Sequence, residues 1–326
     1  MLKNDVLAAL KRAERSVSGA ELSKTLGVSR AAVWKAVESL RKEGYEIEAQ
    51  SAVGYRLTAE PDRLDPAELR RSSGVVGREI LCLDTVDSTN DEVKRRAMAG
   101  AEPGLVVTAE VQTAGKGRRG RGFQSLAGKG LYLSVFLKPD APLEQLSQLT
   151  AWSAVAVCRA IESVCSVKPQ IKWPNDVLAE GKKLCGILTE MGMEAETGAL
   201  GYVVVGMGTN VSQTREDFGP ELEGIATSLK ILGAEVTRRA LALALIAQLE
   251  RLNADFPHGR EAYLAEYERR CITLGREVKL IRPDGEEQVT AQGLTEDFRL
   301  VVCRGDGSVK TVSSGEVSVR GVLGYQ

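Results

Sequence analysis

The chain has 326 residues, and at roughly 100–200 residues per domain this length predicts two or three domains. Apolar residues make up 43% and charged residues 27% of the chain, which excludes intrinsic disorder and is typical of a soluble globular protein. The 43 Lys and Arg against 44 Asp and Glu leave a net charge of −1, which excludes a globally basic nucleic-acid coat but allows a local basic patch.

The sequence also argues against targeting signals, disulfides and histidine-based chemistry. No apolar stretch approaches the roughly 18 residues of a membrane helix, and no signal-peptide core is present, so we expect a cytoplasmic protein without membrane association. The six cysteines show no C-x-x-C spacing and predict neither a disulfide framework nor a zinc site. His258 is the single histidine, which argues against a Ser-His-Asp triad and a multi-histidine metal site. We therefore predict no set of metal-ligating residues.

Residues 1–62 predict a winged helix-turn-helix domain. Apolar stripes and capping residues indicate three short helices, and alternating residues at 45–48 and 53–57 indicate a two-stranded wing. Ser29 is expected to cap the third helix, whose N-terminal end would enter a DNA major groove. The predicted DNA-contacting residues are Ser29, Arg30, Trp34 and Lys35. Because this segment is only weakly basic, the alternative is a three-helix unit that packs on its neighbour and touches no DNA.

The rest of the chain predicts two further domains after a linker at residues 61–66. Residues 63–270 alternate between strands and helices, as in an α/β (α+β) domain with a mixed sheet. Its predicted helices are 87–99, 143–166 and 237–270, and its predicted strands are 79–83, 104–109, 130–137, 167–172, 184–190 and 201–206. Residues 271–326 change to short strands separated by turns, which predicts a small β-barrel. Its predicted strands are 277–281, 288–294, 300–303, 310–312 and 317–320.

The densest chemical signal is the segment 115–122, which reads Gly-Lys-Gly-Arg-Arg-Gly-Arg-Gly and is called the basic loop below. Its glycines let backbone amides approach a ligand closely, and its four cations, with no acid among them, attract a polyanion. Neither the P-loop pattern nor the dinucleotide-binding pattern fits. The alternative is an ordinary solvated loop; flexibility also allows the segment to order on binding.

A second signal joins the segment 172–176 (Lys-Trp-Pro-Asn-Asp) to a lysine seven residues after its aspartate. Asp176 and Lys183 can meet at one site, where a lysine stabilises charge on a transferring phosphoryl group and an aspartate orients an amine or holds Mg²⁺. The alternative is a pair of ordinary surface charges.

Two weaker signals involve neutral residues. The run 87–90 (Asp-Ser-Thr-Asn) opens a helix, and Gln112 precedes the basic loop, so these side chains are either helix caps or the recognition site for a neutral polar ligand. The run 206–210 (Gly-Met-Gly-Thr-Asn) closes a strand with small residues, where a ligand can lie against bare backbone.

Together and in this order, these motifs resemble those of bacterial biotin protein ligases of the bifunctional kind, which are both ligase and biotin-operon repressor. The resemblance covers the whole chain and implies a winged helix, a catalytic domain, and an SH3-like barrel at 271–326. It implies that ATP activates biotin as biotinyl-5′-AMP with release of Mg²⁺-pyrophosphate, and that biotin passes to a lysine of a biotin carboxyl carrier protein. The adenylate-bound homodimer would repress biotin synthesis genes at an operator.

The resemblance also implies three groups of site residues. The implied catalytic residues are Lys183, Arg118 and Asp176. The implied biotin-binding residues are Ser88, Thr89, Asn90, Gln112, Lys116, Gly117, Arg118, Lys183, Gly186, Gly206 and Gly208. The implied ATP- and adenylate-binding residues are Gly115, Arg119, Arg121, Phe123, Asn175 and Asn210. The cations would offset the charge that develops on the α-phosphate, and Asp176 would orient either the adenylate or the incoming amine.

Two residues depart from the family pattern. Lys116 stands where many relatives have Arg, which matters only if the side chain contacts phosphate. Phe123 stands where a Trp often covers the adenine, so we expect weaker retention of the adenylate.

Two other functions are considered: a transcription factor that senses a small ligand without catalysis, and a lipoate or octanoate ligase. Lys183 with Asp176 argues against the first, and the winged helix with the polar cluster at 88–90 argues against the second.

Overall fold

The computed structural model describes residues 2–13, 15–50, 53–70, 73–193, 200–282, 285–313 and 318–321. The chain divides into two compact units, Met1–Arg63 and Leu64–Gln326. None of the helices in the described part of the chain combines the length and the apolar composition that a membrane crossing needs.

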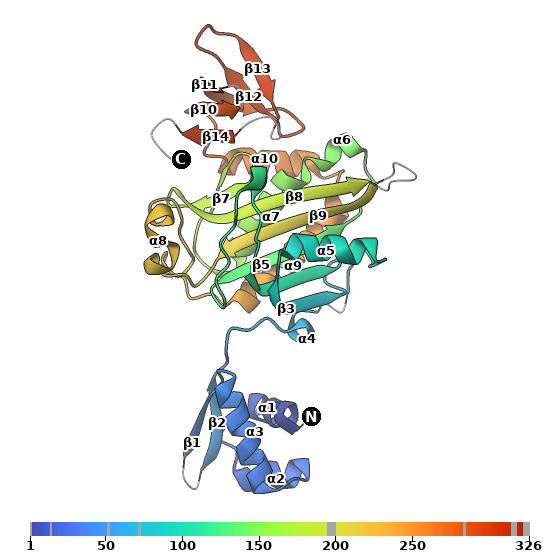
Figure 1. The fold of residues 1–326 in the computed structure, drawn as a ribbon, viewed down its shortest axis with the longest axis vertical. Helices are drawn as coiled ribbons and strands as arrows, with labels where there is room; N and C mark the ends of the chain where they lie inside the picture. The colour runs from blue at the N-terminus through green and yellow to red at the C-terminus, as the bar shows by residue number, and fades with distance from the viewer. Residues whose placement is uncertain are drawn as a thin grey trace. The chain divides into compact units, whose positions relative to one another are not determined.

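The first unit consists of three helices followed by an antiparallel hairpin (Figure 1). Ser29 caps α3 by accepting a hydrogen bond from the Ala32 amide (3.2 Å), as predicted. Gly27, with a φ of +65°, ends α2 in the left-handed conformation. The apolar stripes of the three helices share one buried core. The elements are α1 (Leu2–Arg12), α2 (Gly19–Leu26), α3 (Arg30–Lys42), β1 (Glu46–Gln50) and β2 (Gly54–Ala59).

A seven-stranded mixed sheet forms the centre of the second unit, in the order β3-β4-β5-β9-β8-β7-β6. The neighbours β3 and β4 are parallel, and the other neighbouring strands are antiparallel. The strands are β3 (Ile80–Val86), β4 (Val106–Gln112), β5 (Gly130–Leu137), β6 (Gln170–Lys172), β7 (Asp176–Ala179), β8 (Lys182–Met193) and β9 (Leu200–Asn210).

Helices cover both faces of this sheet (Figure 1). On one face, α7 and α9 bury the odd-numbered residues of β5 in the main core. On the other face, Val93 of α5 shares a second core with Phe136 and Val204, which are paired across β5 and β9. Even-numbered residues of β5 and β9 therefore point to the α5 face. The helices are α4 (Pro66–Leu69), α5 (Thr89–Met98), α6 (Leu143–Leu146), α7 (Leu149–Val164), α8 (Arg215–Glu223), α9 (Arg238–Asp255) and α10 (Arg260–Arg270).

The C-terminal segment forms a five-stranded antiparallel sheet in the order β13-β12-β11-β10-β14. Residue 317 of the predicted last strand lies outside the described residues. Buried side chains of this sheet join the main core of the second unit. The strands are β10 (Glu277–Arg282), β11 (Gly285–Leu294), β12 (Leu300–Cys303), β13 (Val309–Val312) and β14 (Ser318–Gly321).

The predicted fold class is confirmed, but several predicted elements are wrong in their extent. The predicted helix 237–270 is two helices, because Pro257 has no amide proton to donate and holds the preceding residue extended. The predicted helix 143–166 is also divided, at residues 147–148, where the backbone makes a tighter i→i+3 turn. The sequence pattern did not predict the four-residue strand β7 or the helix α8.

Candidate active site

The basic loop is a closed turn between β4 and β5. The Gly117 amide donates a hydrogen bond to the Arg121 carbonyl (2.7 Å), and the Phe123 amide donates one to the Gly115 carbonyl (2.8 Å). Between them, Arg118–Gly120 form a single 3₁₀ turn in which Arg119 has a φ of +58°. This geometry places the start of the loop beside a pocket on the α5 face of the sheet.

The floor of this first pocket is a row of glycines. Gly208 of β9 lies opposite Tyr132 of β5 and opposite Gly186 of β8. A Cβ on Gly206 would lie 2.1 Å from the Asn90 Oδ1, and a Cβ on Gly208 would lie 2.5 Å from the Phe123 Cζ. A Cβ at either position would displace one of these two side chains. The bare backbone predicted from the sequence makes room first for these two protein side chains, and both glycines also line the pocket.

A polar cluster forms one wall, at the start of α5. The buried Ser134 Oγ lies 2.7 Å from the Thr89 Oγ1 and 2.6 Å from the Asn90 Oδ1. The Gln112 Oε1 accepts hydrogen bonds from the Thr89 amide (2.9 Å) and hydroxyl (3.0 Å). Ser88 differs, because no hydrogen bond of its hydroxyl is found among the described residues, although the residue is only 2% exposed. The Ser88 hydroxyl is thus the group of this wall that can receive a new partner.

Asn90 is the most constrained member of the cluster. Its Nδ2 donates to the Leu188 carbonyl (3.3 Å) and to the Glu190 Oε2 (2.7 Å), so both amide protons have acceptors within the protein. Its oxygen accepts from Ser134. These bonds fix the position of Asn90 in the lining of the first pocket.

Two of the three predicted catalytic residues, Arg118 and Lys183, line the first pocket, and Asp176 pairs with Lys183. The Lys183 Nζ lies 2.7 Å from the Asp176 Oδ1, with the two side chains 30% and 16% exposed. The Arg118 guanidinium donates a hydrogen bond of 3.0 Å to the Asn175 Oδ1. Burial lowers the pKa of Arg118 from its ordinary value, and the nearby Asp176 carboxylate opposes this shift. Arg118 remains a cation at neutral pH, so two positive groups and one negative group converge here.

A second pocket adjoins the first. Phe123, Lys183, Gly186 and Gly208 line both pockets, so Lys183 stands at their junction. The outer wall of the second pocket is apolar and includes Phe218 of α8 with residues that follow it. The sequence pattern did not predict this wall. The capping pair of Thr214 and Asp217, followed by apolar residues at positions 218 and 222, was the signal that could have found α8.

The predicted ligand residues are distributed unevenly over the two pockets. All of the predicted biotin-binding residues line the first pocket. Of the predicted adenylate residues, Phe123 lines both pockets, Asn210 lines the second and Asn175 lines the first. The predicted residues Gly115, Arg119 and Arg121 line neither pocket.

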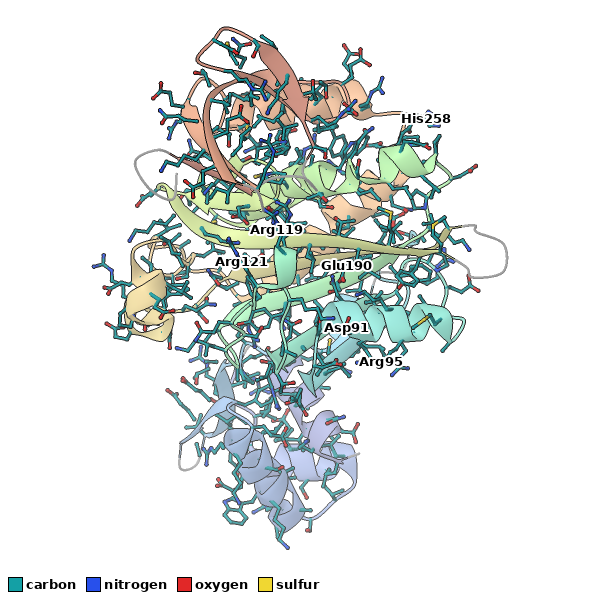
Figure 2. The ribbon with its side chains drawn as sticks, turned by 45° about the horizontal axis from the view of Figure 1, so that its top comes forward. Asp91, Arg95, Arg119, Arg121, Glu190 and His258 are labelled. Carbon is teal, nitrogen blue, oxygen red and sulfur yellow. The ribbon has the colours of Figure 1, made fainter. Side chains whose placement is uncertain are left out.

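The two outer arginines of the basic loop project away from the pocket floor. Arg119 and Arg121 are exposed, and Arg119 donates a hydrogen bond of 3.2 Å to the Ile281 carbonyl on β10. Both lie far from the exposed His258 (Figure 2), so the single histidine takes no part in this site.

Residues from the C-terminal part of the chain hold the segment 172–176 in place. The buried Trp173 donates from its indole nitrogen to the Phe298 carbonyl (2.9 Å) and from its amide to the Thr273 Oγ1 (3.0 Å). The Tyr267 hydroxyl donates to the Pro174 carbonyl (3.1 Å). The sequence suggested no chemistry for residues 271–326, and these bonds give them a positioning role behind Asn175 and Asp176.

The first unit carries its own candidate interface. Arg30, Trp34 and Lys35 are exposed on the N-terminal half of α3, and Trp34 is 54% exposed. Ser29 is exposed as well, but its hydroxyl already caps the helix. An exposed tryptophan beside two cations is unusual for a surface that contacts only water.

Family models match all three parts of the chain. The HTH domain model matches residues 3–56, the Biotin/lipoate A/B protein ligase family model matches residues 82–210, and the Biotin protein ligase C terminal domain model matches residues 273–320. The chain is 36% identical over 323 residues to the bifunctional ligase/repressor BirA of Bacillus subtilis, covering 98% of each protein. It is 31% identical over 308 residues to BirA of Escherichia coli, covering 93% of this chain and 92% of the relative.

Solved structures agree with these matches. The biotin protein ligase from Aquifex aeolicus in complex with biotin and ATP is 29% identical, with a TM-score of 0.63 over 75% of this chain and 99% of that one. Its apo structure is 27% identical, with a TM-score of 0.61. The chain therefore belongs to the biotin protein ligase family, and its matches over nearly the full length are to bifunctional ligase/repressors.

Proposed function

We propose that this protein is an ATP-dependent biotin protein ligase that also represses transcription. The observation that carries the enzymatic part is the junction of the two pockets at Lys183, because a carboxylic acid in one pocket and a nucleotide in the other would meet at this ammonium group. Named relatives include a biotin–[acetyl-CoA-carboxylase] ligase of Mycobacterium tuberculosis, 35% identical over 78% of this chain and 97% of the relative.

The first pocket suits biotin. Its polar wall offers the Ser88 hydroxyl to the ureido group, with Thr89 and Gln112 held beside it by their mutual hydrogen bonds. Leu188 and the rings of Phe123 and Tyr132 supply the apolar lining that the ring and tail need. The second pocket, with Phe123 and the apolar wall of α8, suits an adenine base.

The first half-reaction joins the two ligands. A biotin carboxylate oxygen attacks the α-phosphorus of ATP, the bond to the β-phosphate oxygen breaks, and pyrophosphate leaves. Lys183 and Arg118 oppose the negative charge that develops on the phosphoryl oxygens. This step requires no proton transfer by the protein, which is compatible with a chain whose only histidine lies elsewhere.

The second half-reaction transfers biotin to a lysine of a biotin carboxyl carrier protein. The lysine nitrogen attacks the carbonyl carbon of the mixed anhydride, AMP leaves, and the nitrogen loses a proton. Asp176, which is paired with Lys183, would orient either the adenylate or the incoming amine. No group of three His, Cys, Asp or Glu side chains among the described residues can hold a metal. Mg²⁺ is expected to arrive with the phosphates of ATP, since this ion keeps several waters and commonly binds through substrate phosphates.

The regulatory part uses the first unit. Arg30, Trp34 and Lys35 of α3 are exposed and would read an operator in the major groove, with Ser29 at the helix start. Since residues 1–62 are only weakly basic, one copy would bind DNA weakly, and a homodimer formed on adenylate binding would align two such helices. The catalytic segment 63–270 and the C-terminal segment 271–326 would carry the ligase activity.

Biotin-dependent ATP–pyrophosphate exchange tests the enzymatic proposal, with lipoate and octanoate as parallel substrates. Exchange with biotin alone is expected. Exchange with lipoate or octanoate instead would assign the chain to the other branch of the matched family. Biotin binding without any exchange would favour a ligand-sensing transcription factor.

Sedimentation of the purified protein tests the regulatory proposal. Biotin with ATP is expected to increase the dimer fraction and to tighten binding to DNA from the promoter region of biotin synthesis genes. A monomer fraction that biotin and ATP leave unchanged would contradict the coupling of adenylate binding to dimerisation.

A further inference from the structure

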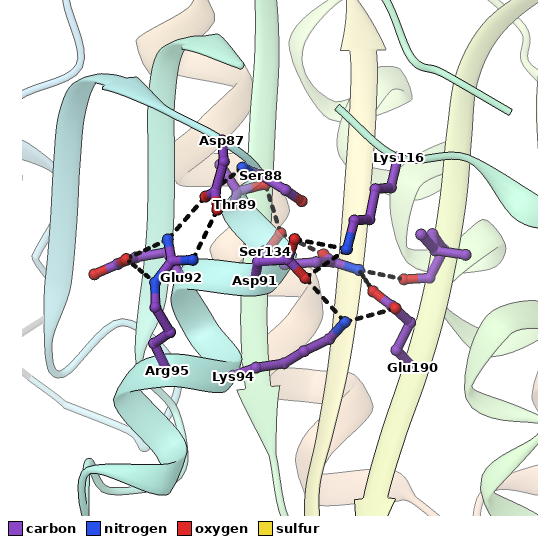
Figure 3. A network of polar contacts seen from close by, with 12 residues as sticks. Asp87, Ser88, Thr89, Asp91, Glu92, Lys94, Arg95, Lys116, Ser134 and Glu190 are labelled. Atoms are coloured by element: carbon purple, nitrogen blue, oxygen red, sulfur yellow. Dashed lines mark hydrogen bonds and ion pairs between the residues drawn. The ribbon is translucent and has the colours of Figure 1, made fainter. Parts of the chain in front are cut away.

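Asp91 and Lys116 form an ion pair between α5 and the basic loop (Figure 3). The Lys116 Nζ lies 2.6 Å from the Asp91 Oδ2 and donates a hydrogen bond of 2.8 Å to the Asp91 Oδ1. The partners are 25 residues apart in the sequence, so the pair connects the first turn of a packed helix to the start of a glycine-rich loop.

The Asp91 carboxylate is ionised near neutral pH. Burial raises its pKa, but hydrogen bonds from Lys116 and Lys94 outweigh burial and bring the pKa below its ordinary value. Asp91 is 22% exposed and Lys116 is 45% exposed, so water screens the pair in part. The contact is strong enough to bias the position of a loop without locking it.

The pair is the outer end of a longer network (Figure 3). The Lys94 Nζ contacts both the Asp91 Oδ1 (3.1 Å) and the Glu190 Oε1 (2.6 Å). The Glu190 Oε2 in turn accepts the hydrogen bond from Asn90, which lines the first pocket. The residue that tethers the loop is thereby held by groups that also fix the pocket wall.

The hydrogen bonds within the basic loop connect the Asp91–Lys116 ion pair to the first pocket. Lys116 pairs with Gly122 across the loop, and the Gly117 amide bonds to the Arg121 carbonyl. Lys116 and Gly117 both line the first pocket. Holding the Lys116 side chain on α5 therefore holds the closed turn of the loop at the pocket rim.

We propose that Asp91 and Lys116 are positioning residues whose ion pair holds the basic loop over the first pocket and slows the escape of the bound adenylate. The identity of the bound molecule rests on the proposed function. The pair also accounts for a lysine at position 116, because a single ammonium group reaches both oxygens of Asp91 and no bidentate phosphate contact is needed.

The first test measures the dissociation rate of synthetic biotinyl-5′-AMP from the full-length protein, chased with excess biotin. Asp91→Asn and Lys116→Met are each expected to raise the rate about two- to fivefold, the range of a partly exposed ion pair. The double variant should be no faster than the faster single variant, because both changes remove the same interaction. The charge exchange of Asp91→Lys with Lys116→Asp should return the rate toward that of the wild type.

Glu92→Gln is the matched control. Glu92 lies on the same turn of α5 and pairs with Arg95 and Arg96, and none of its ion pairs among the described residues involves the basic loop. Glu92→Gln removes two ion pairs of α5, as Asp91→Asn does. It is expected to leave the dissociation rate unchanged. Equal rates in wild type, Asp91→Asn and Lys116→Met would overturn the tether, as would an equal increase in Glu92→Gln.

Hydrogen exchange of the ligand-free protein gives a second readout that does not depend on activity. Amides of residues 115–122 are expected to exchange faster in Asp91→Asn and Lys116→Met than in wild type or Glu92→Gln. If the wild type forms no adenylate, the proposed function is wrong. The comparison of exchange rates still tests whether the Asp91–Lys116 ion pair holds the basic loop. Unchanged exchange in both variants would refute it.

Discussion

Lys183→Met is the substitution with the clearest expected effect on catalysis. Lys183 lies at the junction of the two pockets, and its ammonium group is 2.7 Å from the Asp176 carboxylate. Methionine keeps an unbranched side chain of similar length and removes the charge. Since the pair is partly exposed, its loss should cost no more than about 1 kcal/mol of folding stability.

The catalytic cost is larger. A unit charge about 4 Å from a developing negative charge contributes about 4 kcal/mol at an effective dielectric constant of 20. Asp176 offsets part of this field, because it lies on the same ammonium group. We therefore expect the rate of ATP–pyrophosphate exchange to fall about 100- to 1000-fold, the range seen when one preorganised charge-stabilising group is removed. Biotin affinity should change much less than the rate.

The adjacent lysine offers a matched control. Lys182 is exposed and donates a hydrogen bond of 3.1 Å to the Glu223 carbonyl, away from both pockets. Lys182→Met should keep exchange within about twofold of wild type, since exposed changes of this kind cost little. Exchange by Lys183→Met within tenfold of wild type, or an equal loss in both variants, would refute the assignment of Lys183 as the charge-stabilising residue.

Three further predictions follow from contacts of the second unit. Gly208→Ala would place a Cβ 2.5 Å from the Phe123 ring, and should weaken ATP binding measured by calorimetry at least tenfold because the ring must leave its position. Trp173→Phe leaves the Phe298 carbonyl without its indole donor and should lower the urea-unfolding free energy by about 1–3 kcal/mol. Hydrogen bonds from a lysine and then from two arginines bring the pKa of Glu287 to about 2, so Glu287→Gln should destabilise the protein near neutral pH.

The pH dependence of the last variant has a defined sign. Because the pKa of Glu287 is depressed by folding, its contribution is complete above the unfolded value of 4.5 and is lost as the pH falls toward 2. The difference in stability between wild type and Glu287→Gln should therefore shrink from pH 5 to pH 2; a constant difference would contradict this.

Gly224→Ala, where a Cβ meets no atom within 4 Å, is the control for Gly208→Ala. Unchanged ATP affinity in Gly208→Ala would show that the Phe123 ring does not depend on this glycine.

Local sequence was sufficient wherever a few neighbouring residues decide the conformation. The stop at Gly27, the cap at Ser29 and the apolar stripes of α1 to α3 could be predicted, because capping and helical periodicity act within one or two turns. The basic loop and the pairing of Asp176 with Lys183 were also predictable, since both rest on residues close together in the chain. The short strand β7 was not, because four residues carry too little periodicity.

Only the tertiary structure decided which distant groups meet and which of their bonds are already used. Asn90 was predicted to contact the ligand and lines the first pocket, and its amide protons bond to Leu188 and Glu190 about a hundred residues later. Lys116 was predicted to surround the ligand, and its ammonium group pairs with Asp91 on α5. The sequence specifies residue type and local shape, but a side chain's partner depends on how sheets and helices pack. A donor that already bonds to one partner in the protein cannot donate the same proton to a ligand.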